Sequence, residues 1–389
     1  MYITNMTPLD VHNLKTGKIE IAPKTPLETK EDLSFIYTPG VGEVSTAIAK
    51  DKEKVNLYTN KKNTVAIVTD GSAVLGLGDI GPEAALPVME GKSVLFKKFG
   101  NIDAYPILLK TQDVDEIVET IIDISPTFSG INLEDISAPR CFEIEKKLKE
   151  KLDIPVFHDD QHGTAIVVLA ALINALKLAE KNIRDVKIII NGAGAAGIAI
   201  KKLLRIYGAR KICLLDSKGV ICERRTDLTS TKKSLLANLD CQCGSLEETI
   251  ESADVFIGVS KGNILTKKLI KKMTSEPIIF AMANPIPEIS YEEAKVAGAF
   301  IAATGSSETP NQINNALVFP GLFRGLLDSN TSIITDELKI FAAETIANYV
   351  TNLNPGNIMP DIMDLAFHKT LAKTISSHSE DHVRVPSYL

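Results

Sequence analysis

Short apolar stretches alternate with amphipathic stretches along most of this chain. In the first half, four runs rich in apolar and β-branched residues predict strands at 64–69, 105–109, 129–133 and 154–157. A shorter apolar run, 93–96, predicts one more strand. Apolar residues recur at helical spacing over 114–124 and 139–152, which predicts helices between the strands. Residues 1–62 show few strand signals, and we expect helix and loop there.

The alternation continues in the second half, after a long apolar stretch at 164–181 that predicts a helix. Five further strands are predicted at 186–191, 211–216, 254–260, 278–283 and 299–304. After Asn311 the pattern is helical, and Thr335 is expected to cap a helix over 336–350. Strands that alternate with helices are typical of parallel sheets covered by helices.

Composition narrows the class of protein. The chain has 389 residues, 44% hydrophobic and 24% charged, as expected for a globular protein with two cores. A net charge of −6 with scattered basic residues gives no electrostatic reason to expect nucleic acid or an anionic membrane as a partner. The longest apolar run, 165–179, is short for a membrane span. An odd number of cysteines, five, and an N-terminus without an apolar targeting core favour a reducing, cytoplasmic compartment.

A glycine-rich turn follows the predicted strand at 186–191. Its spacing is G-x-G-x-x-G, and the residues expected to contact a ligand are Gly192, Gly194, Ala195, Ala196 and Gly197. Glycines here let a pyrophosphate approach the backbone, and the helix that follows offers N–H groups and a positive dipole at its N-terminus. This context predicts dinucleotide binding, whereas the alternative is a tight turn without a ligand.

The next strand ends at Asp216, a position that discriminates between NAD and NADP. A carboxylate there accepts hydrogen bonds from the adenosine ribose and repels a 2′-phosphate, so NAD is favoured. Lys218 and Arg210 are close in sequence, and either cation would accept the phosphate of NADP. The cofactor is therefore predicted to be NAD, with NADP as the alternative.

Two pairs of acids stand at the ends of predicted strands: Glu134 and Asp135, then Asp159 and Asp160. Buried carboxylates are costly unless a cation, a proton or a cationic side chain compensates them. Ligands gather at the carboxyl ends of parallel strands, and oxygen ligands suit Mg²⁺ or Mn²⁺. The equally weighted alternative is that these acids cap the helices that follow them.

Two other polar residues in the first half are candidate functional residues. Tyr37 stands beside a Pro-Gly turn, and Lys92 precedes the predicted strand at 93–96. A lysine in a dry site or near a cation has a lowered pKa and can act as a base. Taken alone, Lys92 is better explained as a solvated lysine at a strand end.

These motifs together resemble malic enzyme in its short bacterial-type form. The resemblance runs from about Tyr37 to Leu326 and rests on motifs in family order. They are YTPGVG at 37–42, LGLGDIG at 75–81, GK at 91–92, NLED at 132–135, FHDDQHGT at 157–164, the glycine turn at 192–197, ANP at 283–285, PNQINN at 310–315 and FPG at 319–321.

The resemblance implies oxidative decarboxylation of L-malate to pyruvate and CO₂, with reduction of NAD(P) and a divalent metal. By position it implies Glu134, Asp135 and Asp160 as metal ligands and Asp159 as a support. It implies Lys92 as general base and Tyr37 as general acid. Two asparagines, Asn284 and Asn315, match those that hold substrate carboxylates near the nicotinamide. The family is oligomeric, so a homodimer is expected.

The predicted fold is α/β with two domains. Residues 161–314 are expected to form a doubly wound Rossmann NAD(P)-binding domain. Residues 1–160 and 315–389 are expected to form a mixed α/β domain for substrate, metal and oligomerisation, with the final helices returning to pack on it.

Two departures from the family pattern bear on affinity. Ser72 and Ala73 stand where longer members carry an arginine that contacts substrate, and Ser306 replaces an arginine usual in short members. Two rival functions stay open from the residues alone. One is a 2-hydroxy-acid or amino-acid dehydrogenase that needs no metal. The other is a protein that senses NAD without turnover.

Overall fold

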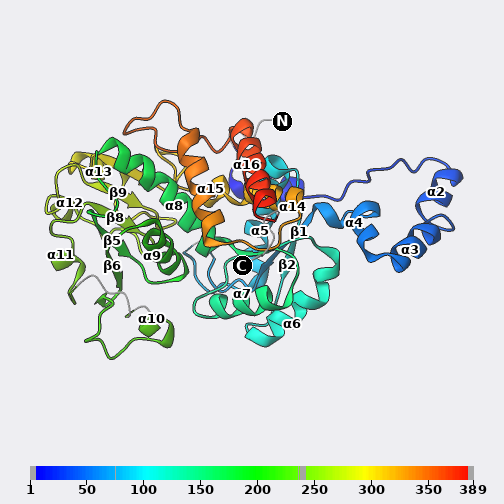
Figure 1. Cartoon of the computed structure of the whole chain (residues 1–389), viewed down its shortest axis with the longest axis horizontal. Helices are drawn as coiled ribbons and strands as arrows, with labels where there is room; N and C mark the ends of the chain where they lie inside the picture. The colour runs from blue at the N-terminus through cyan, green and yellow to red at the C-terminus, as the bar shows by residue number, and fades with distance from the viewer. Residues whose placement is uncertain (1–5, 75, 235, 237–241, 384–389) are drawn as a thin grey trace.

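The structure is a computed structural model that describes residues 6–74, 76–234, 236 and 242–383. Two sheets of mainly parallel strands form two lobes, and an arm of short N-terminal helices projects from the body (Figure 1). The first sheet has the order β2-β1-β3-β4, and all its strands are parallel. Its strands are β1 (Thr64–Thr69), β2 (Asp103–Leu108), β3 (Ile131–Leu133) and β4 (Val156–His158).

The second sheet has the order β10-β9-β8-β5-β6-β7. Its strands are β5 (Lys187–Asn191), β6 (Lys211–Asp216), β7 (Gly219–Val220), β8 (Val255–Gly258), β9 (Ile278–Ala281) and β10 (Ile301–Thr304). Read from its other edge, this is the strand order of a dinucleotide-binding sheet, except that the short β7 runs antiparallel to β6. The prediction of an α/β fold with a doubly wound sheet is confirmed.

Helices cover both faces of the first sheet. On one face, α6 (Val114–Ile124) and α7 (Arg140–Lys151) pack together over a core of strand and helix side chains. On the other lie α5 (Pro82–Gly100), α14 (Phe319–Ser329) and α16 (Leu365–Val383), which contact one another. Phenylalanines join these layers: the ring of Phe96 lies 4.7 Å from that of Phe319 and 5.4 Å from that of Phe323. Each buried phenylalanine contributes roughly 1.5–3 kcal/mol through the hydrophobic effect.

The predicted strand at 93–96 is wrong. These residues lie inside α5, where Ser93 and Phe96 are buried. The helix is packed between the first sheet and α14, so apolar residues occur around much of its circumference. A short apolar run does not distinguish such a helix from a strand.

The second sheet is also covered on both faces. Alternate residues of β5 point to opposite sides, so Ile188 and Ile190 share a core with α8 (Asp159–Leu178) and α9 (Ala195–Tyr207), and Ile189 joins the other core. That second core is closed by α11 (Leu246–Thr249), α12 (Lys267–Ile270) and α13 (Tyr291–Val296). A short helix, α10 (Ser230–Ser234), lies in the long connection after β7.

The helix α8 connects the two lobes. By length and composition it would span a membrane, but 72% of its most apolar window is buried inside the protein. Asn174, its polar residue in mid-helix, donates hydrogen bonds to the carbonyls of Ala347 and Ile358 at 2.9 Å each. These bonds tie α8 to the end of α15 (Asp336–Tyr349), which is capped by Thr335 as predicted. We therefore interpret α8 as a core helix.

The N-terminal arm lacks a core of its own. It comprises α2 (Lys30–Ile36), α3 (Val41–Lys50) and α4 (Val55–Tyr58), and none of these helices has a buried residue. The preceding α1 (Pro8–Lys15) also has none, but it lies by the body, where the backbone N–H of Lys18 donates to Glu90 of α5. Large apolar side chains are exposed on the arm, among them Leu27, Phe35 and Leu57 at 58%, 71% and 72%. Figure 1 shows α2 and α3 at the end of an extended segment, away from both sheets.

Candidate active site

Four acids meet where β3 and β4 end. Glu134 and Asp135 follow β3, whereas Asp159 and Asp160 begin α8 directly after β4. Carboxylate oxygens of Glu134, Asp135 and Asp160 all lie within 4.8 Å of one another. The backbone N–H of Asp135 donates to Oδ2 of Asp160 at 2.9 Å, and Asp135 has a left-handed φ of +52°. The structure therefore brings the three predicted metal ligands to one place, and Asp159 lies buried behind them.

Lys92 reaches this cluster from α5. Its Nζ lies 2.5 Å from Oε1 of Glu134 and 2.5 Å from Oδ2 of Asp159. The same atom lies 4.7 Å from the centroid of the Phe319 ring, and the residue is only 7% exposed. The alternative of a solvated lysine at a strand end is therefore wrong.

The charges in this cluster do not balance. Burial alone lowers the pKa of Lys92, but Asp159, Glu134 and Asp160 outweigh burial and raise it. Burial also raises the pKa of Asp159 to about 7 and that of Asp160 to about 6, and Lys92 offsets only part of this effect. The prediction that the pKa of Lys92 is lowered is therefore wrong for the protein side chains alone. One lysine cannot compensate four carboxylates, and a divalent cation among the oxygens fits this excess of negative charge.

The side chain of Glu145, on α7, binds residues at the start of α8. Its Oε1 lies 2.8 Å from Nε2 of His162, and Lys149 makes an ion pair with it at 2.7 Å. The side chain of Gln161 donates to Oε2 at 3.3 Å. Burial raises the pKa of Glu145, but His162 and Lys149 outweigh burial and lower it well below its usual range. Sequence reasoning missed this acid, although it lies on the buried stripe of α7, where an acid requires partners.

The glycine turn leads from β5 into α9. Gly192 has a left-handed φ of +130°, and a Cβ on Gly197 would overlap the carbonyl oxygen of Gly192. Gly194 is the N-cap of α9 without a side-chain cap, and a Cβ there would meet no atom within 4 Å. Close packing therefore explains two of the glycines, whereas Gly194 faces open space in front of the helix N-terminus. A diphosphate fits this space.

Replacing Gly194 with aspartate tests the turn. Aspartate is a favourable N-cap residue, and the backbone of Gly194 is extended, so folding stability should hold or rise by roughly a few tenths of a kcal/mol. The added carboxylate would repel a diphosphate, so the Kd for NADH should rise by about 100-fold or more. Fluorescence titration with NADH and a thermal melt measure both effects. Unchanged NADH affinity in a folded variant would exclude the turn as the cofactor site.

The two asparagines lie on separate segments, each in contact with a different glycine. Asn315 begins a 3₁₀ turn, and its Cβ lies 3.2 Å from where a Cβ on Gly163, the fifth residue of α8, would be. Asn284 follows β9 in an exposed loop. A Cβ on Gly76, which has φ +79°, would overlap the carbonyl oxygen of Asn284. The glycine at 76 therefore permits the loop after β1 to touch the loop after β9, a role that the sequence did not reveal.

Tyr37 is far from the acid cluster within one chain. It directly follows α2, which lies on the projecting arm (Figure 1). Its side chain is exposed. The structure of a single subunit therefore does not bring the predicted general acid to Lys92.

Asp216 ends β6 as predicted, and its carboxylate contacts cationic side chains that the sequence did not indicate. The sequence suggested Lys218 and Arg210 as nearby cations, whereas the side chains that contact the carboxylate belong to Arg225 and Lys232. Both come from the connection after β7, and no pattern in the sequence linked them to Asp216.

Comparison with known proteins agrees with this geometry. A sequence profile for the malic enzyme N-terminal domain matches residues 16–149, and one for the malic enzyme NAD-binding domain matches residues 161–377. The chain belongs to the malic enzyme family.

Relatives and solved structures of this family cover nearly the whole chain. The chain is 53% identical to a bifunctional malic/malolactic enzyme of Bacillus subtilis over 95% of its own length and 91% of that protein's. It is 54% identical to an NAD-dependent malic enzyme of Geobacillus stearothermophilus over 90% and 73% of the two chains. The crystal structure of an NAD-dependent malic enzyme from Thermotoga maritima superimposes with a TM-score of 0.92 at 47% identity, over 96% and 99% of the chains. Other relatives are named NADP-dependent malic enzymes.

The pKa values of the acids predict how a malic enzyme of this geometry responds to pH. Protons compete with a metal for Glu134 and Asp160, whose pKa values are raised chiefly by burial. Mn²⁺ affinity should therefore fall as the pH drops from about 7 to about 5, and binding near pH 6 should release protons. Calorimetry in buffers of different ionisation enthalpy measures both quantities. Equal affinity at both ends of this range would contradict the ligand assignment.

Proposed function

We propose that this chain converts L-malate to pyruvate and CO₂ with reduction of NAD(P), and that the reaction depends on Mg²⁺ or Mn²⁺. The observation that carries the proposal is the position of α8. Its first turn supplies two acids of the cluster beside Lys92, and α8 then packs on α9, which begins at the glycine turn. Acids for a metal and a turn for a dinucleotide thus lie at the starts of two helices that pack on each other.

In the proposed site, Glu134, Asp135 and Asp160 hold the cation. A bound divalent cation supplies Lewis acidity at the C2 oxygen of malate and at the enolate oxygen left after CO₂ departs. Lys92 takes the proton of the C2 hydroxyl as hydride leaves C2 for the nicotinamide. Asp159 holds the Lys92 amine through the 2.5 Å ion pair, which keeps it aimed at the cluster. A cation bound to Glu134 and Asp160 would offset the negative charges that raise the pKa of Lys92.

Asn284 and Asn315 are proposed to bind the substrate carboxylates. Asn315 lies against Gly163 of α8, and Asn284 lies on the loop that Gly76 contacts. Ser306 donates its backbone N–H to Oγ1 of Thr304, beside the same loop. Side chains from both lobes therefore border the substrate, and substrate binding would draw the lobes together.

The protein is proposed to act as a homodimer in which the arm of one subunit completes the site of the other. The exposed apolar side chains of the arm favour burial against a second copy. Tyr37 lies on this arm, so Tyr37 of the partner subunit would donate the proton to C3 of the enol. This arrangement reconciles the role implied for Tyr37 with its distance from Lys92 in one chain.

NAD is proposed as the favoured cofactor when the Asp216 carboxylate is free to accept the ribose hydroxyls. Initial rates with NAD and with NADP at equal concentration compare the two directly. A higher kcat/KM for NADP under reducing conditions would contradict this preference.

Formation of NADH from L-malate tests the proposed function. Turnover should need Mn²⁺ or Mg²⁺ and stop with a chelator. Asp160→Asn should abolish it, because an amide is a poorer ligand for a hard cation than a carboxylate. The exposed Asp153 offers a matched control, Asp153→Asn, with wild-type turnover. Full activity in a chelator would favour a metal-free dehydrogenase, and NAD binding without turnover would favour a sensor.

A further inference from the structure

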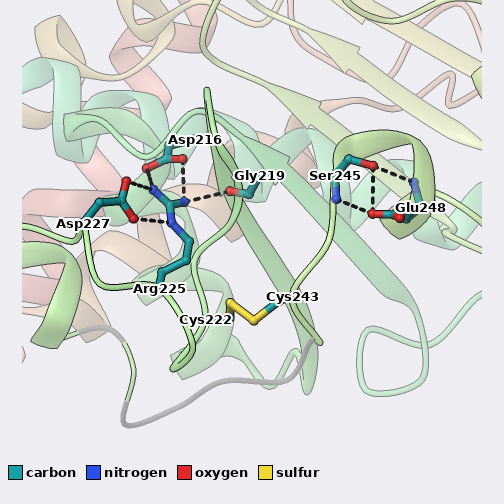
Figure 2. Close-up of a disulfide and its surroundings, with 8 residues drawn as sticks. All are labelled: Asp216, Gly219, Cys222, Arg225, Asp227, Cys243, Ser245 and Glu248. Carbon is teal, nitrogen blue, oxygen red and sulfur yellow. Dashed lines mark hydrogen bonds and ion pairs between the residues drawn. A yellow bond between two sulfur atoms is a disulfide. The ribbon is translucent and has the colours of Figure 1, made fainter.

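The connection after β7 folds back on the end of β6 and is closed by a disulfide. Cys222 and Cys243 are bonded, 21 residues apart in sequence and 5.5 Å apart between Cα atoms (Figure 2). The backbone N–H of Val220 donates to the carbonyl of Gly244 at 2.8 Å beside this bond. The sequence predicted reduced thiols, and the structure differs because folding places these two cysteines side by side. Cys141 is a free, buried cysteine.

Arg225 and Lys232, carried by this connection, saturate Asp216. Arg225 donates from Nη1 to Oδ1 at 2.7 Å and from Nη2 to Oδ2 at 3.1 Å, as Figure 2 shows. Lys232 donates to Oδ2 at 2.5 Å, and the backbone N–H of Lys218 donates to Oδ1 at 2.9 Å. A carboxylate has about four lone-pair sites, and four donors occupy them here.

A second carboxylate, that of Asp227, also binds the cations beside Asp216. Asp227 holds Arg225 through Nε at 2.9 Å and Nη2 at 2.8 Å, and it pairs with Nζ of Lys218 at 2.9 Å. Burial raises the pKa of Asp216, but hydrogen bonds from Arg225 and Lys232 outweigh it and lower the pKa to about 2. Three cations therefore face two carboxylates, which leaves one positive charge in surplus.

This arrangement changes what the end of β6 offers a cofactor. A ribose diol donates hydrogen bonds and needs a free acceptor, whereas every acceptor site of Asp216 is occupied. The N–H groups of Arg225 are all bonded to Asp216, Asp227 and the carbonyl of Gly219, so a 2′-phosphate would bind by taking the place of the Asp216 carboxylate. An anionic phosphate can compete for Arg225 in this way, whereas a neutral ribose diol cannot displace Arg225 from Asp216. The disulfide-bonded form therefore suits NADP better than the sequence around Asp216 predicted.

We propose that Arg225 and Lys232 form a 2′-phosphate subsite that the Cys222–Cys243 disulfide holds at Asp216, so that the choice between NAD and NADP follows the state of this bond. The proposal rests on the proposed dinucleotide site. Without this bond, the connection has one covalent link fewer, which raises its conformational entropy. Arg225 and Lys232 then spend less time at Asp216, and its carboxylate is free for the ribose of NAD.

The bond is broken by a dithiol reductant through thiol–disulfide exchange. Cys243 is partly exposed and Cys222 is buried, so a thiolate of the reductant attacks the sulfur of Cys243 and Cys222 leaves as a thiolate. The second thiol of the reductant then displaces Cys243. The products are two protonated cysteines and the oxidised, disulfide form of the reductant.

Binding of adenosine 2′,5′-bisphosphate and of 5′-AMP tests the proposal without turnover, because the two differ only in the 2′-phosphate. The measured quantity is the ratio of their Kd values by calorimetry. The oxidised protein should bind the bisphosphate more tightly. Arg225→Ala and Lys232→Ala should each shift the ratio against it by about tenfold. The neighbours Arg224 and Lys233, both exposed, give the matched controls Arg224→Ala and Lys233→Ala, which should keep the wild-type ratio.

The role of the bond is isolated by the variant Cys222→Ala/Cys243→Ala, which retains every cation. Its ratio should shift in the same direction as that of Arg225→Ala. Cys213 is disulfide-bonded as well, so reduction of the wild-type protein breaks more than this bond, and the double variant is the measurement that isolates it. Cys141→Ala serves as the thiol control. An unchanged ratio in Arg225→Ala, or in the double variant, overturns the proposal. Failure of the oxidised wild type to bind either nucleotide would refute the dinucleotide site itself, and the subsite with it.

Discussion

Replacing Lys92 with alanine should lower kcat for malate oxidation by about 10²–10⁴-fold, the range typical of a lost general base. Mn²⁺ should still bind, because the variant removes a cation from beside Glu134 and Asp159 and leaves the carboxylates in place. NADH should bind as in the wild type, since the glycine turn lies on the other lobe. Initial rates, calorimetry with Mn²⁺ and NADH titration measure the three effects.

The variant Lys92→Arg distinguishes the role of Lys92 in proton transfer from its role in the ion pairs. Lys92→Arg keeps a positive charge near Glu134 and Asp159 but cannot give up a proton near neutral pH. Turnover should therefore be lost in this variant as well. Lys98 lies exposed on the same helix, and Lys98→Ala is the matched control. Substantial turnover in Lys92→Arg would mean that Lys92 only balances charge.

Tyr37→Phe should also be nearly inactive alone, yet a mixture of Tyr37→Phe and Lys92→Ala subunits should recover activity. If the arm crosses the dimer, each mixed dimer has one site with both residues intact and one site with neither. Random exchange at equal amounts then gives about a quarter of wild-type activity, because half of the dimers are mixed. The measurement is malate-dependent NADH formation after unfolding and refolding the two variants together.

Separate refolding of each variant is the control and should stay inactive. If Tyr37 and Lys92 acted within one subunit, every site in the mixture would lack one of them. A mixture with no recovered activity would thus contradict the arm exchange. The related variant Phe35→Ser, on the same exposed arm, should weaken dimerisation in sedimentation experiments.

The periodic parts of the fold were predictable from the sequence. The parallel strands and the helix at 114–124 follow from local apolar patterns, and α6 matches its prediction at both ends. The run at 93–96 was misread because α5 is packed on several sides. The start of α8 was placed too late, because Asp159 and Asp160 belong to its first turn rather than to a loop.

The candidate site was predictable in its residue types but not in its geometry. The strand ends placed Glu134, Asp135 and Asp160 together, and the structure agrees. Contacts that depend on distant segments left no local signal: Arg225 on Asp216, Glu145 behind α8, and Gly76 against the loop of Asn284. The metal, the dimer and the compartment stay predictions.

The most direct test of the central claim is the product balance with L-malate labelled at C4, NAD and Mn²⁺. Metal-assisted oxidation and decarboxylation at the Lys92 site predict equal amounts of NADH, pyruvate and labelled CO₂, all abolished by a chelator and by Asp160→Asn. NADH accompanied by oxaloacetate without labelled CO₂, or a product balance that persists in the chelator, would contradict the account.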